Sequence, residues 1–133
     1  MNINTNNSYV LASSSKSRYA ILKKSGFIFK QVRPFCDEDY IKRNIQVYKK
    51  QPQIYARKLS YEKAKSVSLM KKYTQHNVIG CDTLIFLKNK IFDKAKNIRE
   101  AKKKLKILSG KKHKIITRLT ICKNGKIVWQ TSS

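Results

Sequence analysis

Acidic residues at two places along the chain carry the most specific chemistry in this sequence. Asp82 stands inside the apolar run 78–87, where a carboxylate is costly unless it meets a metal ion, a cation or solvent in a cleft. Glu38, between Asp37 and Asp39, is the other obvious source of carboxylate oxygens. Hard oxygen ligands of this kind, with retained waters, suit Mg²⁺ or Mn²⁺.

A serine-rich turn offers a second kind of site. Ser13, Ser14 and Ser15 stand where a predicted strand passes into a helix whose first turn contains Lys16 and Arg18. Free backbone N–H groups, hydroxyl donors and a cation at the positive end of a helix together suit a phosphate. The alternative is that one of these serines only caps the helix. The glycine-rich Walker loop of many nucleotide-binding proteins is absent from the sequence.

Lys63 is unusual because it lies on the apolar side of a predicted helix. If residues 53–72 are helical, the apolar stripe around Lys63 consists of Ala56, Leu59, Val67 and Met70. A lysine in this position either extends along the surface to water or places its ammonium group in a polar site, because burial without an anion is costly.

Strand and helix signals alternate along the chain. We expect strands over residues 9–12, 27–32, 77–87, 91–92, 115–122 and 126–130. Helices are expected after the serines up to Gly26, from Pro52 to about Tyr73, and over residues 97–108. We expect an acidic turn at residues 37–39 and hairpin turns at residues 88–90 and 124–125. The pattern predicts an α/β fold with a mixed, twisted sheet flanked by helices, in a single domain over residues 1–133 with a disordered leader at residues 1–8.

Composition limits the possible partners. The 133 residues carry a net charge of +24, and 25 of the 31 basic residues are lysine, spread over the whole length. Nucleic-acid binding is possible but not favoured, because groove readers rely on arginine. The three cysteines have no C-x-x-C spacing, which argues against a disulfide framework or a zinc site. Without an apolar leader or a long apolar run, the sequence predicts a cytoplasmic protein that does not enter a membrane.

Six short strings resemble the Maf family in their order and spacing. They are the segments 11–18, 37–38, 61–64, 78–83, 92–94 and 108–113. The resemblance implies a fold like that of Maf proteins and inosine triphosphatases. It also implies a nucleoside triphosphate pyrophosphatase, which hydrolyses the α–β phosphoanhydride bond of non-standard or modified nucleotides to a monophosphate and pyrophosphate. Such an enzyme would remove unwanted nucleotides from the cytoplasmic nucleotide pool.

The resemblance also implies roles for single residues. Asp82 matches the proton acceptor and, with Glu38, would hold Mg²⁺ or Mn²⁺. Ser17 and Thr83 match two positions that tune base choice. The residues that match the triphosphate-binding set are Ser13, Arg18, Lys63 and Lys94.

This sequence departs from the family at several positions. Lys16 replaces a frequent proline, and Ser17 is neither the arginine of members acting on dTTP and UTP nor the bulky aromatic residue of members acting on 7-methyl-GTP. Base preference is therefore open. The family pattern continues beyond Ser133, so we expect a C-terminally shortened protein with an incomplete second lobe.

Two other expectations follow from this shortening. The protein could be a catalytically impaired remnant or a basic module that binds nucleotides or nucleic acid. It could also form a homodimer or join a chain that supplies the missing lobe.

Overall fold

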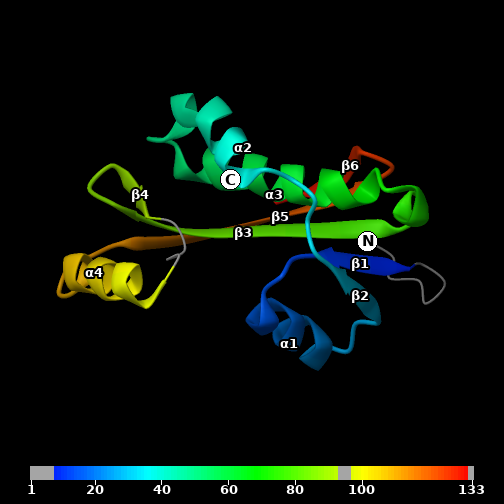
Figure 1. Ribbon diagram of the computed structural model, residues 1–133, viewed down its shortest axis with the longest axis horizontal. Helices are drawn as coiled ribbons and strands as arrows, with labels where there is room; N and C mark the ends of the chain where they lie inside the picture. The colour runs from blue at the N-terminus through cyan, green and yellow to red at the C-terminus, as the bar shows by residue number, and fades with distance from the viewer. Residues whose placement is uncertain (1–7, 93–96, 132–133) are drawn as a thin grey trace.

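The computed structural model describes residues 8–92 and 97–131. In these residues it has an α/β fold, with six strands in one mixed sheet and four α-helices, as the sequence predicts (Figure 1). The strands are β1 (Tyr9–Ala12), β2 (Phe29–Val32), β3 (Asn77–Leu87), β4 (Lys90–Phe92), β5 (Lys114–Lys123) and β6 (Lys126–Gln130). The helices are α1 (Lys16–Lys24), α2 (Glu38–Asn44), α3 (Pro52–Ser68) and α4 (Ile98–Leu108), with short 3-10 turns at Gln46–Tyr48 and Lys71–Tyr73.

The sheet leaves part of β3 open along one edge. Its strand order is β2-β1-β3-β5-β6, with β1 parallel to both β2 and β3, and the short β4 also pairs with β3. The pairing with β1 ends at Gly80, and the pairing with β4 begins at Ile85. Over residues 81–84, β3 therefore has no strand partner on this edge among the described residues, while β5 pairs with the other edge throughout.

Apolar side chains pack on both faces of the sheet. The face toward α3 buries Val10, Ala12 and Val78 against the helix, and farther along it buries Leu84 and Ile116. The opposite face, on the side of α1, buries Tyr9, Leu11, Ile79 and Ile121. Figure 1 shows α2 and α3 on one side of the sheet and α1 on the other. Alternate residues of β3 thus face different helices.

The closest approach between α3 and the sheet is at Gly80. A Cβ atom built there would collide with the carbonyl oxygen of Ser60, and it would lie 2.8 Å from the nitrogen and 2.9 Å from the Cβ of Ala64. The φ angle of Gly80 is not positive, so the lack of a side chain, rather than an unusual backbone, is what the fold requires here. This approach places Lys63, the neighbour of Ala64, over β3.

Several element boundaries differ from the prediction. The helix expected to reach Tyr73 ends at Ser68, and Met70 is half-exposed instead of joining the apolar stripe. The expected acidic turn is the start of α2, because the side chain of Asp37 accepts a hydrogen bond from the backbone N–H of Tyr40 at 3.2 Å and caps the helix. The second strand begins at Phe29 rather than at Phe27.

Helix α4 is amphipathic but has no buried residue. The side chains of Ile98 and Leu105 are 76% and 68% exposed. Trp129 of β6 is also exposed. No helix in the described part of the chain has the length and apolar character needed to cross a membrane. Of the expected leader, only Ser8 lies within the described residues, and its carbonyl accepts a hydrogen bond from the N–H of Asn77.

Candidate active site

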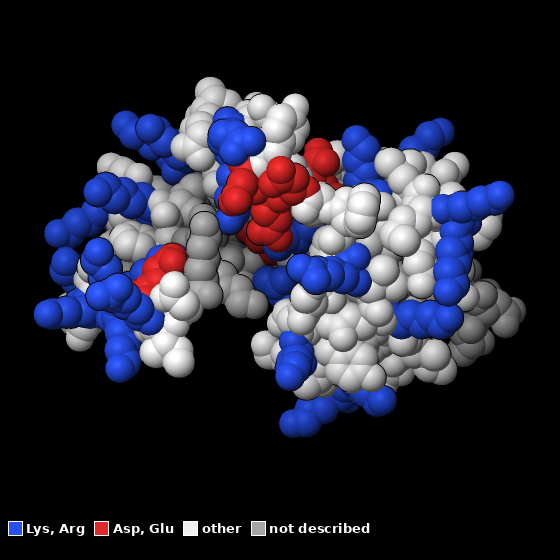
Figure 2. All heavy atoms as spheres, viewed as in Figure 1, with Lys and Arg blue, Asp and Glu red and all other residues white. Residues whose placement is uncertain are grey.

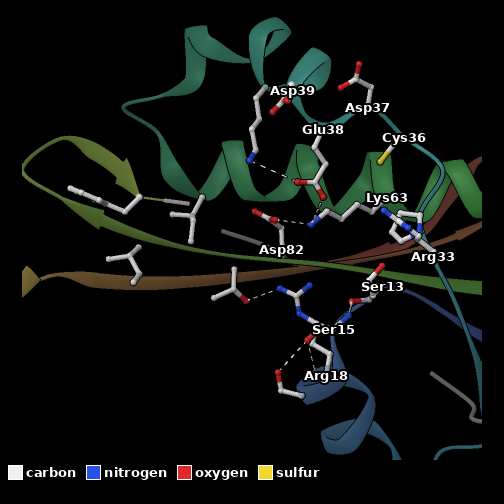
Figure 3. A pocket seen from close by; sticks show the side chains of 18 of the residues that line it. Ser13, Ser15, Arg18, Arg33, Cys36, Asp37, Glu38, Asp39, Lys63 and Asp82 are labelled. Carbon is white, nitrogen blue, oxygen red and sulfur yellow. Dashed lines mark hydrogen bonds and ion pairs between the residues drawn. The ribbon is translucent and has the colours of Figure 1, made fainter. Parts of the chain in front are cut away.

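A cleft of about 820 Å³ opens where β1 ends and β3 continues alone. Three parts of the chain line it: the serine turn with the first residues of α1, the segment 33–42 that leads from β2 into α2, and residues of α3, β3 and β4 (Figure 3). The cleft thus lies at the carboxyl ends of the parallel strands β1 and β2, which is where α/β sheets commonly bind ligands.

Asp82, Lys63 and Glu38 form a charged group in this cleft. The Lys63 ammonium donates a hydrogen bond to Asp82 Oδ1 at 3.0 Å and lies 3.2 Å from Glu38 Oε1 (Figure 3). Lys63 and Asp82 are each only 8% exposed, whereas Glu38 is more open to solvent. Of the two alternatives for Lys63, the structure therefore shows the second, with the ammonium group in a polar site.

The surroundings shift the pKa values of this buried pair. Burial raises the pKa of the Asp82 carboxyl above its ordinary value, and the nearby Lys63 ammonium only partly opposes this. Burial alone would lower the pKa of Lys63, but the carboxylates of Asp82 and Glu38 outweigh it, so the pKa of Lys63 is raised. Lys63 therefore stays charged at neutral pH, and Asp82 is a more basic carboxylate than an exposed one.

The serine turn both caps α1 and lines the cleft. Ser15 Oγ accepts a hydrogen bond from the N–H of Arg18 at 3.2 Å, while Ser13 Oγ accepts one from the N–H of Ser15 at 3.1 Å. The Arg18 guanidinium reaches the open edge of β3, where it donates to the carbonyl oxygen of Cys81 at 3.0 Å and to Thr83 Oγ1 at 3.3 Å. Arg18 thus joins the start of α1 to the strand that carries Asp82.

The cleft collects acidic residues in a strongly basic protein. Among the residues that the structure describes, four acidic ones line it, Asp37, Glu38, Asp39 and Asp82. Four described basic residues line it as well, Arg18, Arg33, Lys42 and Lys63. Figure 2 shows most of the red acidic side chains near the middle of this face, with a separate red patch at the end that carries α4, while blue side chains are spread over the same face. The net charge of +24 is therefore a property of the surrounding surface and not of the cleft.

Glu38 and Asp82 are the residues that could hold a metal ion. No group of three or more possible histidine, cysteine or carboxylate ligands occurs in the part of the chain that the structure describes. The two carboxylates nevertheless share one cation, the Lys63 ammonium, so their oxygens lie close enough to share another. Mg²⁺ is commonly held by one or two carboxylates together with substrate phosphates and water, and this donor set fits that pattern.

The structure brings most of the predicted site residues together. Those lining the cleft are Ser13, Ser17, Arg18, Glu38, Lys63, Asp82 and Thr83. Lys94 lies outside the described residues.

The cleft is also lined by Arg33, Cys36 and Lys42, which were not predicted from the sequence. Lys42 lies 3.8 Å from Glu38 Oε2, one helical turn away. The i, i+4 spacing of this pair would have been informative if α2 had been predicted.

Comparison with known proteins finds the same family that the six strings resemble. The family model described as Maf-like protein matches residues 8–133. A nucleoside triphosphate pyrophosphatase of Pelagibacter ubique is 33% identical over 120 residues, which are 90% of this chain and 60% of that protein. A 7-methyl-GTP pyrophosphatase of Bartonella henselae is 35% identical over 120 residues, again 90% of this chain and 59% of that protein. The chain thus spans about three fifths of the length of these relatives.

Proposed function

Since the chain belongs to the Maf family, we propose that it is a nucleoside triphosphate pyrophosphatase that releases pyrophosphate from the substrate and leaves a nucleoside monophosphate. The observation that carries this proposal is the buried contact of Lys63 with Asp82 and Glu38, in a cleft that the serine turn also lines. The names of the two relatives described above agree with it. The proposed substrates are non-standard or modified nucleotides, removed from the cytoplasmic pool.

Asp82 is the proposed proton acceptor. In the reaction, water attacks the α-phosphorus, the bond from this phosphorus to the bridging oxygen breaks, and the attacking water gives up a proton. The raised pKa of Asp82 makes its carboxylate a stronger base for this proton than an exposed aspartate would be. In the ligand-free structure this carboxylate lies at the cleft, where it contacts the Lys63 ammonium.

Cationic and hydroxyl groups are proposed to bind the triphosphate. Ser13, Arg18 and Lys63 line the cleft from the serine turn, α1 and α3, and Lys94 is proposed as a fourth contact. Positive groups at these positions would neutralise the charge that develops on the phosphate oxygens in the transition state. Ser17 and Thr83 both line the cleft, where Arg18 contacts Thr83, and we propose that they influence the choice of base.

Glu38 and Asp82 are proposed to hold Mg²⁺ or Mn²⁺. When bound, such an ion would offset negative charge on the phosphates and lower the pKa of a coordinated water. The two carboxylates provide the oxygen ligands, and the rest of the coordination would come from phosphate and water.

The open cleft bears on possible partners. We propose that a second copy of the chain or a separate polypeptide contacts the cleft, which opens beside residues 81–84 of β3, where β3 has no strand partner on that edge among the described residues. Nucleic acid is not the favoured partner, because the basic residues of the chain are mostly lysine and not arginine.

The test is release of pyrophosphate from a panel of standard and modified nucleoside triphosphates, with Mg²⁺ or Mn²⁺. We expect turnover by the protein and none above background by Asp82→Asn. Glu62→Gln is the matched control, since it removes one carboxylate from the same part of the fold without lining the cleft. Equal pyrophosphate release by Asp82→Asn and the unaltered protein would contradict the proposal. Binding of RNA without any turnover would instead favour the basic binding module.

A further inference from the structure

We propose that Lys63 occupies the divalent-metal site of the free protein and moves to the triphosphate when the metal ion binds. The inference rests on the proposed function, because it takes Glu38 and Asp82 as the metal ligands. It adds an order of events to that function: the lysine and the metal exchange places.

The geometry of the ion pairs carries the first step. Both carboxylates that would hold the metal contact the same ammonium group, at 3.0 Å for Asp82 and 3.2 Å for Glu38. Lys63 is 8% exposed, so this ammonium is a resident cation and not a mobile surface charge. A divalent ion bound by the same oxygens would lie within a few ångströms of the ammonium, where two positive charges repel strongly. The ammonium and the metal therefore exclude one another.

Lys63 can move away while Glu38 and Asp82 each keep a positively charged partner. Lys63 lines the cleft, and its four-carbon stem lets the ammonium group turn toward a ligand there. The serine turn and Arg18 line the opposite wall of the cleft, beneath the sheet in Figure 3. Glu38 would keep Lys42, which lies 3.8 Å from its second oxygen. Asp82 would exchange one cation for another.

This exchange couples the two ligands of the site. A metal ion alone must displace a buried ammonium, which then has no anion. A metal-free triphosphate must enter beside four carboxylates. When both bind together, the metal takes the carboxylates and Lys63 takes a phosphate. Each ligand therefore raises the affinity for the other, and by linkage the two effects are equal.

The first test measures Mn²⁺ binding without any nucleotide, by the electron paramagnetic resonance signal of free Mn²⁺. Lys63→Met should bind Mn²⁺ at least about tenfold more tightly than the unaltered protein, because the competing charge is gone. Lys65→Met is the matched control, since it removes the same charge from the same helix without touching the carboxylates, and its affinity should not change. The double variant Lys63→Met/Asp82→Asn should lose the gain. An affinity of Lys63→Met equal to or weaker than that of the unaltered protein would overturn the exchange.

A second test uses the unaltered protein and so does not depend on the folding of a variant. Brief acetylation followed by mass spectrometry reports how accessible each lysine is. Mn²⁺ should increase the labelling of Lys63, and inorganic triphosphate added with Mn²⁺ should reduce it again, while the labelling of Lys65 stays constant. Unchanged labelling of Lys63 at saturating Mn²⁺ would refute the proposal.

The two tests also separate this inference from the proposed function. A protein that releases no pyrophosphate but shows both Mn²⁺ effects would contradict only the proposed function. A protein that hydrolyses nucleotides without showing the Mn²⁺ effects would contradict only the exchange.

Discussion

Replacing Gly80 with alanine should destabilise the fold and open the site together. The added methyl group would meet the backbone of α3, namely the carbonyl oxygen of Ser60 and the nitrogen of Ala64, and also the Ala64 side chain. Backbone atoms of a helix cannot rotate away as a side chain can. The whole helix must therefore move away from β3 at this point.

The size of the effect follows from these contacts. The Cβ of Ala64 would lie 2.9 Å from the new methyl carbon, whereas carbon atoms pack at about 3.5–4.0 Å, so α3 must move by close to 1 Å. Overpacking typically costs about 1–3 kcal/mol, and we expect about 3 kcal/mol because backbone lies in the way. In a domain of this size, that corresponds to a fall in Tm of about 10 °C. The same movement would stretch the 3.0 Å contact between Lys63 and Asp82.

Thermal unfolding followed by circular dichroism measures the first effect, and acetylation of Lys63 measures the second. Gly26→Ala is the control, since its methyl group would meet nothing within 4 Å and only the positive φ of 89° is strained, at a cost of about 1 kcal/mol. Adding Ala64→Gly to Gly80→Ala should not restore stability, because the backbone contacts persist. The reasoning is refuted if Gly80→Ala melts within about 3 °C of the unaltered protein, or if Ala64→Gly rescues it.

Three further predictions concern the rest of the fold. Burial raises the pKa of the Cys122 thiol from 9.0 to about 11. Because the thiol of the unfolded chain loses its proton at lower pH than that of the folded chain, the free energy of unfolding should fall above pH 9. Urea unfolding at pH 8 and pH 10 should show a loss of stability that is roughly 1 kcal/mol larger in the unaltered protein than in Cys122→Ala. An equal loss in both proteins would contradict this. The buried hydroxyls of Ser60 and Thr120 share a 2.7 Å hydrogen bond. Ser60→Ala and Thr120→Val should each lower the free energy of unfolding by about 1 kcal/mol. A double-mutant cycle should give a coupling energy of at least about 0.5 kcal/mol, and strictly additive losses would contradict a stabilising hydrogen bond. The side chain of Leu105 is 68% exposed. Leu105→Gln should therefore change the free energy of unfolding by no more than about 0.5 kcal/mol and reduce the binding of a hydrophobic dye. A large fall in Tm would contradict this, because it would mean that the side chain is covered.

Local patterns in the sequence were enough to predict most of the fold. The strand at residues 77–87 and the hairpin at Asn124-Gly125 are confirmed, because apolar β-type runs and positive-φ turn residues act over a few neighbouring positions. Helix α2 was missed because five of its seven residues are charged or carry an amide and none of the seven is buried, so its one aliphatic residue, Ile41, gives no periodic pattern. Its start depends on the cap that Asp37 provides, which resembles a simple turn when read alone.

The residues of the site could be predicted from the sequence, but the contacts between them could not. A lysine at position 63 and an aspartate at position 82 are both unusual among apolar neighbours, and that anomaly indicated a polar site. Their pairing depends on how closely α3 approaches β3, which is set by Gly80. Arg33 and Cys36 gave no comparable signal, because they enter the cleft from an irregular segment with no periodic pattern.

The exposed apolar side of α4 has a consequence for the motions of the molecule. A helix with no buried residue gains little free energy from packing, so its backbone hydrogen bonds should open locally without unfolding the sheet. Hydrogen exchange should therefore be faster in α4 than in α3, which packs against the sheet beside Lys63. The end of the molecule that carries α4 can thus loosen, or be covered by another polypeptide, while the cleft around Asp82 keeps its arrangement.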